Sequence, residues 1–181
     1  MEINERMGRT GSLFNTMKTT FFGKKGIPEK VKTAVVKSVV RPTIMYSSET
    51  WTLTGRQKSR VNAMEMRFLR KIANRKRTDK IRNETIRQNL KLEPINEKIV
   101  EGQLRWFGHV CRMSNERLTK RVFETRVQGK NKRGRPRVMW VDEIRKEVEK
   151  KGLTLESARN LAQDRKAWRL QCQTQLHQPY T

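Results

Sequence analysis

Acidic residues are scarce in this chain, and their shortage indicates what kind of partner it has. The sequence holds 18 Asp and Glu against 42 Lys and Arg, a net charge of +24 over 181 residues. An excess of this size opposes compaction by self-repulsion, and a polyanionic partner is the usual reason to keep it. Solubility alone needs only about 2–8 net charges in a small domain. The charge therefore predicts DNA and/or RNA as the partner.

Cysteines and long apolar runs are scarce as well. Two cysteines, Cys111 and Cys172, do not make a disulfide framework, and the first residues do not resemble a signal peptide. We therefore expect a nuclear or cytoplasmic protein that is not secreted. No apolar run approaches the roughly 18 residues of a membrane span, so no membrane partner is expected. Apolar residues make up 34% of the chain, but four Trp and six Phe are enough to seed a core.

Carboxylates suited to polymerase chemistry are missing. Such chemistry uses two Mg²⁺ ions bridged by carboxylates. The three aspartates, Asp79, Asp142 and Asp164, lie far apart in the sequence. The sequence therefore predicts no catalytic site and no cofactor in this chain.

A zinc site is not expected either. The four candidate ligands are His109, Cys111, Cys172 and His177. Structural zinc sites usually take paired ligands separated by two or more residues, and His109 and Cys111 are separated by one. We expect Cys111 to be a small buried apolar residue and His109 to be a polar residue near a helix end.

The apolar residues recur mostly at helical spacing. We expect an all-α protein, an irregular bundle of about seven to eight helices with basic loops and little or no sheet. Pro42 is expected to end the second helix at about residue 41, because a proline disfavours α geometry in the residue before it. Thr54 and Thr154 are expected to cap helices, and Pro136 to begin one. The candidate helical segments span residues 3–23, 28–41, 55–73, 80–90, 94–113, 115–125 and 136–150. Two further candidate segments follow, one after Thr154 and one from Asp164.

Several apolar side chains are expected in the core. A valine run predicts one buried stripe on the second helix, formed by Val31, Val35, Val36, Val39 and Val40. Tyr46 and Trp51 are expected to anchor the irregular segment that follows. Trp106 and Trp140 are expected in the core more strongly than Trp168.

Residues 56–82 form the first basic block. They hold eleven Lys and Arg against Glu65 and Asp79, a net charge of 11 − 2 = +9. A solvated helix usually mixes Glu with Lys for support between successive turns, so the missing acids favour a phosphate-tracking surface over a plain solvated face. The residues expected to contact nucleic acid here are Arg56, Arg60, Arg67, Arg70, Lys71, Arg75, Lys76 and Arg77.

Residues 129–137, GKNKRGRPR, form the second basic block. This segment carries five Lys or Arg, two glycines, Pro136 and no acid. Arg-Gly-Arg-Pro also has the form of a short arm that lies in the minor groove of A·T-rich DNA. Two alternatives stay open for this segment. It contacts phosphates alone, or it is a plain connector whose proline starts a helix. The residues expected to contact nucleic acid here are Lys130, Lys132, Arg133, Gly134, Arg135 and Arg137.

Five phrases stand in a fixed order along the chain. They are Tyr46-Ser47-Ser48-Glu49-Thr50-Trp51-Thr52-Leu53; Met66-Arg67-Phe68-Leu69-Arg70-Lys71-Ile72; Leu104-Arg105-Trp106-Phe107-Gly108-His109-Val110-Cys111-Arg112-Met113; Arg133-Gly134-Arg135-Pro136 with Trp140-Val141-Asp142; and Ala162-Gln163-Asp164-Arg165-Lys166-Ala167-Trp168. In that order and spacing they resemble the C-terminal part of non-LTR retrotransposon (LINE-type) reverse transcriptases, also called endonuclease-reverse transcriptases.

The resemblance implies an arrangement and a role. Residues 1–90 resemble the helical thumb of these enzymes, residues 91–173 the helical region beyond it, and residues 174–181 form a frayed tail. It implies contact with template RNA or target DNA, and with the missing palm domain. The family's catalytic motif, an adjacent Asp pair after an aromatic residue, does not occur here, so we expect the palm upstream and no polymerisation by this chain alone. Two alternatives stay open: a part of an active RNA-directed DNA polymerase, or a decayed transposon product with no selected role.

Overall fold

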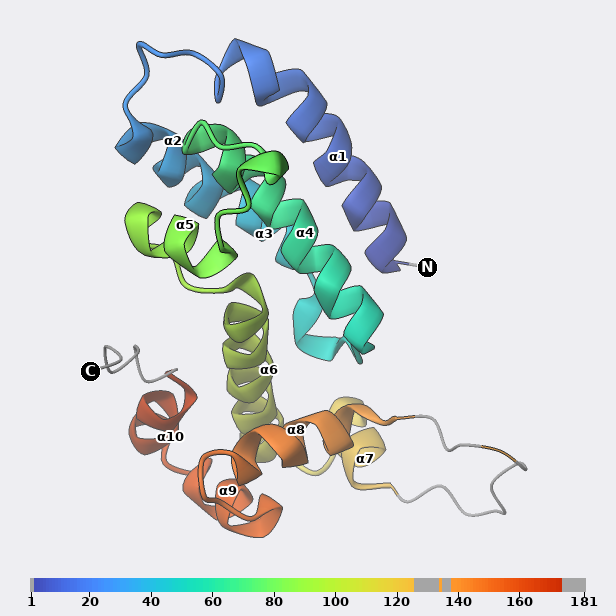
Figure 1. Ribbon diagram of the computed structural model, residues 1–181. Coiled ribbons are helices and arrows are strands. Elements are labelled where there is room, and N and C mark those ends of the chain that lie inside the picture. The colour runs from blue at the N-terminus through green and yellow to red at the C-terminus, as the bar shows by residue number, and fades with distance from the viewer. Residues whose placement is uncertain (1, 126–133, 135–137, 174–181) are drawn as a thin grey trace. The chain divides into compact units, whose positions relative to one another are not determined.

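The computed structural model describes residues 2–125, 134 and 138–173, and these residues form helices and loops without a strand (Figure 1). The expectation of an all-α protein is confirmed. The first helices are α1 (Glu2–Thr20), α2 (Glu29–Val35), the π-helical turn η1 (Val36–Val40), α3 (Arg41–Met45), the 3₁₀ turn η2 (Ser48–Thr50), α4 (Gly55–Ile72), the 3₁₀ turn η3 (Arg77–Asp79) and α5 (Asn83–Leu90). The rest are α6 (Ile95–Arg112), α7 (Leu118–Glu124), α8 (Trp140–Glu149), α9 (Leu155–Leu161) and α10 (Arg165–Cys172).

Short polar side chains set the beginnings of three helices, as the sequence predicts. Thr54 and Gln57 form a reciprocal capping box at the start of α4. The Thr154 hydroxyl accepts from the Ser157 N–H at 3.1 Å at the start of α9. Asp164 accepts from the backbone N–H groups of two residues in the first turn of α10, at 2.8 and 3.2 Å. Each cap satisfies donors that the first helical turn leaves without partners.

The expected helix end at Pro42 is wrong, because the helix continues through the proline. Pro42 has no N–H and its ring crowds the carbonyl of the residue four positions earlier. The π-helical turn η1 lies directly before it, and there the Arg41 N–H bonds to the Val36 carbonyl. A π turn widens the helix by one residue, which relieves the clash and lets α3 follow.

The expected valine stripe is only half right. Val36 and Val40 are fully buried, but Val31 and Val39 are 47% and 43% exposed and Val35 is half-buried. The extra residue of the π turn changes the rotation of the helix, so one row of side chains, not the whole run, faces inward. Tyr46, an expected anchor, is also exposed; Trp51 is buried as expected.

The helix expected to begin at Pro136 begins at Trp140 instead. Pro136 itself lies outside the described residues. Val138 and Met139 are not helical, and the Met139 N–H donates to the Asp142 carboxylate at 3.0 Å. An Asp at the third helical position favours a helix start at Trp140, because its carboxylate satisfies a donor at the N-terminus.

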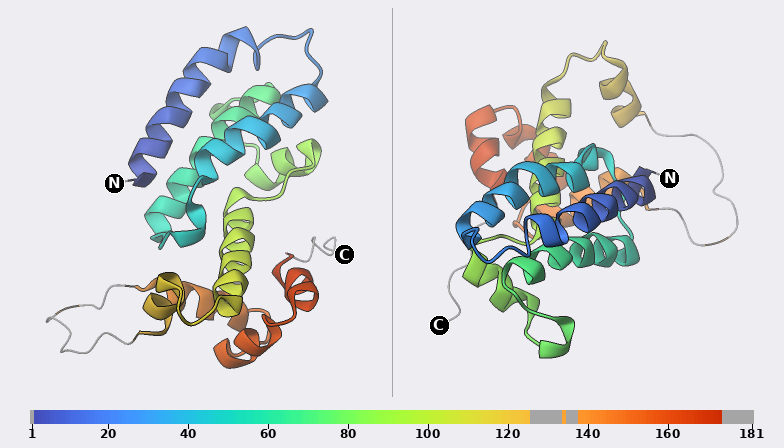
Figure 2. Two further views of the ribbon diagram at one scale, coloured as in Figure 1. Left: turned by 180° about the vertical axis from the view of Figure 1, so that it is seen from behind. Right: turned by 90° about the horizontal axis from the view of Figure 1, so that it is seen from above.

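The chain divides into two compact units. The first comprises Met1–Ser47 and Leu53–Lys98, and the second Ser48–Thr52 and Ile99–Thr181. In the first unit α1 lies along α4, and Phe68 of α4 packs edge-to-face against Phe14 and Phe22 at centroid distances of 5.0 and 5.4 Å (Figures 1 and 2). These ring contacts hold α1 and the loop after it on α4.

The second unit has its own core between α6, α8, α9 and α10. Phe107 of α6 lies at its centre, 5.5 Å from the Trp168 ring and 5.9 Å from the Phe123 ring between centroids. The buried members are Leu104, Phe107, Cys111, Ile144, Val148, Ala158, Ala162, Trp168 and Cys172.

Hydrogen bonds from three side chains, Gln103, Trp140 and Trp168, connect segments of this unit that lie far apart in the sequence. Gln103 of α6 donates to the carbonyls of Ser48 and Trp51 at 3.3 and 2.8 Å. The indole N–H of Trp140 donates to the Glu49 carbonyl at 2.7 Å, and that of Trp168 to the Leu104 carbonyl at 2.8 Å. The segment Ser48–Thr52 therefore belongs to the second unit although it lies early in the chain.

Candidate nucleic-acid interface

The solvent face of α4 carries a row of cations. Arg56, Arg60, Arg67, Arg70 and Lys71 repeat at spacings of three, four and seven residues, opposite the buried row that includes Val61, Phe68 and Ile72. We call these five the α4 basic face. From Arg56 to Lys71 the helix rises about 22 Å, at about 1.5 Å per residue. Charges on one strand of duplex DNA recur every 3.4 Å or so, so this length matches roughly six phosphates.

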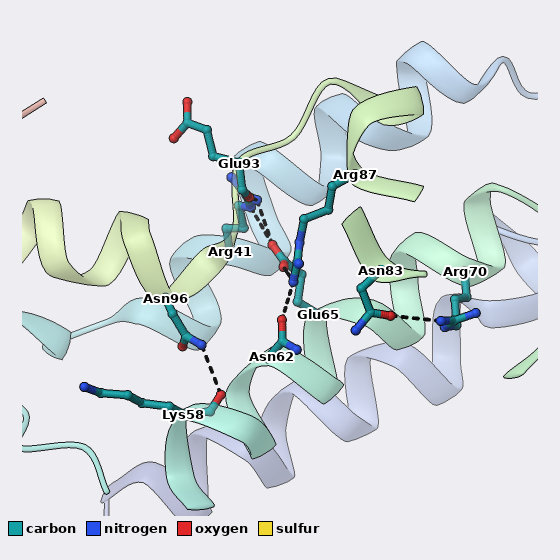
Figure 3. A network of polar contacts seen from close by, with 9 residues as sticks. All are labelled: Arg41, Lys58, Asn62, Glu65, Arg70, Asn83, Arg87, Glu93 and Asn96. Carbon is teal, nitrogen blue, oxygen red and sulfur yellow. Dashed lines mark hydrogen bonds and ion pairs between the residues drawn. The ribbon is translucent and has the colours of Figure 1, made fainter. Parts of the chain in front are cut away.

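The acids of this block do not offset the charge of that face. Glu65, the one acidic residue of α4, has no exposed surface. Its carboxylate accepts from Arg41 Nε at 2.9 Å and from Arg87 Nη2 at 3.2 Å, both also buried (Figure 3). Asp79 accepts from the Lys76 N–H at 2.9 Å. Glu65 therefore does not lie among the cations of the α4 basic face, because its side chain faces inward.

One backbone carbonyl and one side chain bind the two arginines that surround Glu65. Arg41 also donates to the Glu93 carbonyl, and Arg87 to the side-chain oxygen of Asn62 (Figure 3). Arg41 begins α3 and Arg87 lies in α5. The buried carboxylate thus joins α3, α4 and α5 and holds α4 with its basic face outward.

The predicted contact residues of this block are not equivalent. Arg70 is a structural residue: its guanidinium donates to the carbonyls of Lys76 and Ile81 and to the Asn83 side chain at 2.9–3.3 Å. This clamp shapes the loop that follows α4. It also makes Arg70 the member least available to a ligand, because three of its bonds are internal.

The remaining members of the α4 basic face differ in how they are held. Arg67 lies over the Phe14 ring at 4.5 Å from its centroid, and Arg60 donates to the Asn4 side chain at 2.8 Å. Lys71 is half-buried and Arg56 is exposed. Cation–π stacking and a hydrogen bond orient guanidiniums without removing their charge, so Arg60 and Arg67 keep their positive charge in a fixed direction.

The loop after α4 adds exposed cations. Arg75, Lys76 and Arg77 are all exposed, and Arg77 opens the 3₁₀ turn η3. Lys80 ends that turn in the left-handed conformation, at φ 52°. The loop therefore extends the cationic surface beyond the C-terminal end of α4.

The second basic block lies almost wholly outside the described residues. Lys130, Lys132, Arg133, Arg135 and Arg137 fall there, so their contact with nucleic acid stays a prediction. Gly134 is described: it is exposed and has φ +124°. L side chains rarely adopt this conformation, so a glycine is required at this position for a backbone reason.

The order of burial among three tryptophans differs from the expected order. Trp168 is 2% exposed and fully part of the core, whereas Trp106 and Trp140 are half-buried. Gly108 explains the difference, since a Cβ at that position would lie 2.2 Å from the Trp168 ring. Because Gly108 has no side chain, the Trp168 ring packs directly against the backbone of α6.

Neither cysteine has the environment of a reactive thiol. Cys111 and Cys172 are free and buried, as expected for Cys111. Burial raises the pKa of both thiols, to about 12 for Cys172. No group of three or more His, Cys, Asp or Glu that would hold a metal ion occurs within the described part of the chain. None of the described helices is long and apolar enough to cross a membrane.

The sequence predictions omitted one cluster of basic side chains. Arg105, His109 and Arg112 lie on one face of α6, and Arg165 and Arg169 lie on one face of α10. The spacings i, i+4, i+7 and i, i+4 indicate two helix faces. Nothing in the sequence indicates that these two faces meet, because α7, α8 and α9 lie between them in the chain.

The comparisons with known proteins give one similarity. The chain is 27% identical over 176 residues to an uncharacterized transposon-derived protein of Caenorhabditis elegans. The match covers 92% of this chain and 62% of that protein, so the chain spans less than two thirds of its relative. No protein-family model matches the chain, and neither does any solved structure. The similarity supports a transposon origin.

Proposed function

We propose that this chain binds nucleic acid through the α4 basic face and the loop after it, as the helical part of a LINE-type reverse transcriptase that follows the catalytic palm. By itself it binds and does not polymerise. The observation that carries the proposal is the inward orientation of Glu65. A helix whose one carboxylate is buried against two arginines presents an uncompensated row of cations, and such rows track phosphates.

Two further observations support the proposal. The similarity to a transposon-derived protein covers nearly the whole chain. Three of the phrases that resemble the reverse transcriptases contribute large buried side chains to the cores: Phe68 and Leu69 in the first unit, and Phe107 and Trp168 in the second. The resemblance therefore concerns the residues that make the fold.

The location of the binding surface is tested by removing three of its exposed cations. We expect the variant Arg56→Ala, Arg75→Ala, Arg77→Ala to bind duplex DNA, an RNA–DNA hybrid and single strands more weakly. Each lost phosphate contact should reduce the slope of log K against log salt by about one, so the slope should fall by about three. Fluorescence anisotropy over a salt series measures both quantities.

A matched control separates this surface from the net charge. The variant Lys18→Ala, Lys25→Ala, Lys30→Ala removes the same charge from exposed positions of the first unit outside the block. It should keep most of the affinity and nearly the whole slope. Equal losses in the two variants would show that binding is diffuse and would refute the proposed location.

A further inference from the structure

A cavity in the second unit is lined mainly by arginines. Its volume is about 500 Å³, and its lining residues are Arg105, His109, Arg112, Arg165, Trp168 and Arg169. Binding sites for small ligands in proteins have volumes of about 300–1,000 Å³. A space of this size exceeds what a single phosphate ion fills and has room for the group to which a phosphate is attached.

The basic side chains come from two helices that each direct one face into the cavity. Arg105, His109 and Arg112 come from α6, and Arg165 and Arg169 come from α10. The Trp168 indole holds α10 against α6 by its 2.8 Å bond to the Leu104 carbonyl. The positions of the guanidiniums relative to one another therefore depend on a buried contact.

Two of the arginines are fixed by bonds within the protein. Arg112 is half-buried, and its Nη1 donates to the Ala162 carbonyl at 2.5 Å. Arg105 lies 3.0 Å from the carboxylate of Glu101, one turn earlier on α6. A guanidinium has five N–H donors in a planar fork, so each of these bonds leaves donors for an anion.

The negative groups near the cavity do not cancel its charge. Glu101 offsets Arg105, and Asp164 accepts two backbone N–H groups at the start of α10. The residues that line the cavity include no carboxylate to offset Arg112, Arg165 and Arg169. An internal phosphodiester carries one negative charge, whereas a phosphate monoester carries about 1.5 to 2 at neutral pH. The surplus of cations favours the group with more charge.

We propose that this cavity binds a phosphate group with more than one negative charge, either the 5′-phosphate end of a nucleic-acid strand or the phosphates of a nucleotide. Planar guanidiniums bind phosphate oxygens in pairs of hydrogen bonds, which gives such a site its strength. The proposal goes beyond binding along α4 and does not rest on it, since it concerns other residues and a ligand that is testable without any nucleic acid.

The test uses the full chain and pyrophosphate in isothermal titration calorimetry. We expect pyrophosphate to bind the unchanged chain, and the variant Arg165→Ala, Arg169→Ala to bind it at least tenfold more weakly. The control Lys166→Ala removes a cation of the same helix that does not line the cavity, and it should bind like the unchanged chain. Circular dichroism of each variant checks that the helical fold is kept.

A second arm identifies the source of the phosphate. Single strands of one sequence, with either a 5′-phosphate or a 5′-hydroxyl, are compared by anisotropy. A tenfold preference for the 5′-phosphate that disappears in Arg165→Ala, Arg169→Ala assigns the cavity to strand ends; pyrophosphate binding without that preference assigns it to nucleotides. The proposal is overturned if neither probe distinguishes the double variant from the unchanged chain. Affinity for the 5′-hydroxyl strand reports separately on binding along α4.

Discussion

At the scale of single residues, Glu65 is the side chain on which the first unit most depends. It lies on α4 with no exposed surface, between Arg41 and Arg87, whose side chains are 9% and 7% exposed. A buried ion pair is weak evidence of net stabilisation, because desolvation of the charges offsets much of their attraction. Removal of one partner is costly, however, because the remaining charges stay buried without compensation.

We therefore expect Glu65→Gln to lower the free energy of unfolding by about 3–5 kcal/mol, the usual cost of breaking a buried pair. Urea denaturation followed by circular dichroism measures it. Glu116→Gln, at an exposed loop position, serves as control and should change stability by less than about 0.5 kcal/mol. A loss at Glu65 as small as at Glu116 would contradict the burial of the pair.

At the scale of secondary-structure elements, α6 and α10 pack together because of one missing side chain. Gly108 lies on α6 where a Cβ would lie 2.2 Å from two atoms of the Trp168 ring. Glycine inside a helix normally costs about 0.5–1 kcal/mol relative to alanine. Here the helix propensity lost at Gly108 is offset by the burial of the Trp168 indole, the largest type of side chain.

We expect Gly108→Ala to destabilise the protein by about 1–3 kcal/mol, the usual cost of overpacking a core. It should also change tryptophan fluorescence, because the Trp168 indole must leave the Leu104 carbonyl. Gly102→Ala on the same helix is the control. Its added Cβ would meet Glu49 at 3.8 Å, an ordinary contact, so it should be neutral or slightly stabilising. Thermal melts in which both variants behave alike would contradict the packing of Trp168 on Gly108.

At the scale of the whole molecule, charge governs behaviour. A net charge of +24 attracts polyanions, and the attraction is strongest at low salt. Binding that depends on released counterions weakens as salt is added, and the slope counts the neutralised phosphates. The α4 basic face without Arg70 and the three exposed cations of the loop after it supply seven cations, enough to neutralise about six phosphates.

We therefore expect log K for duplex DNA to fall with log salt at a slope of about −5, or about a thousandfold between 50 and 200 mM salt. Anisotropy titrations at four or more salt concentrations measure this slope. A flat response would sink the proposal that this chain binds nucleic acid by its charge.

Much of the fold was predictable from the sequence, because its signals are local. Thr54, Thr154 and Asp164 cap helices through atoms a few residues away, and helical spacing of apolar residues needs no tertiary information. The helix through Pro42 was not predictable in this way. Its continuation depends on the π turn before it, and a π turn depends on how the row Val36, Val40, Ile44 packs.

The candidate site was likewise predictable in part. Residue type and spacing indicated the α4 basic face, but not that Arg70 clamps the following loop through Ile81 and Asn83. The cationic cavity was missed because Arg112 and Arg165 come from helices separated by α7, α8 and α9.

The amino-acid sequence by itself determined that this protein is helical, strongly basic and without an adjacent Asp pair, because composition and short-range spacing are enough for each of these. Tertiary structure alone decided which charged side chains are buried and which lie together at the surface. It placed Glu65 inside, where it pairs with arginines and leaves the outer face of α4 positive. It also brought Arg105 and Arg169 to one cavity, because Gly108 lets Trp168 hold α10 on α6. Burial and long-range contact are properties of the folded chain, and charge counts do not contain them.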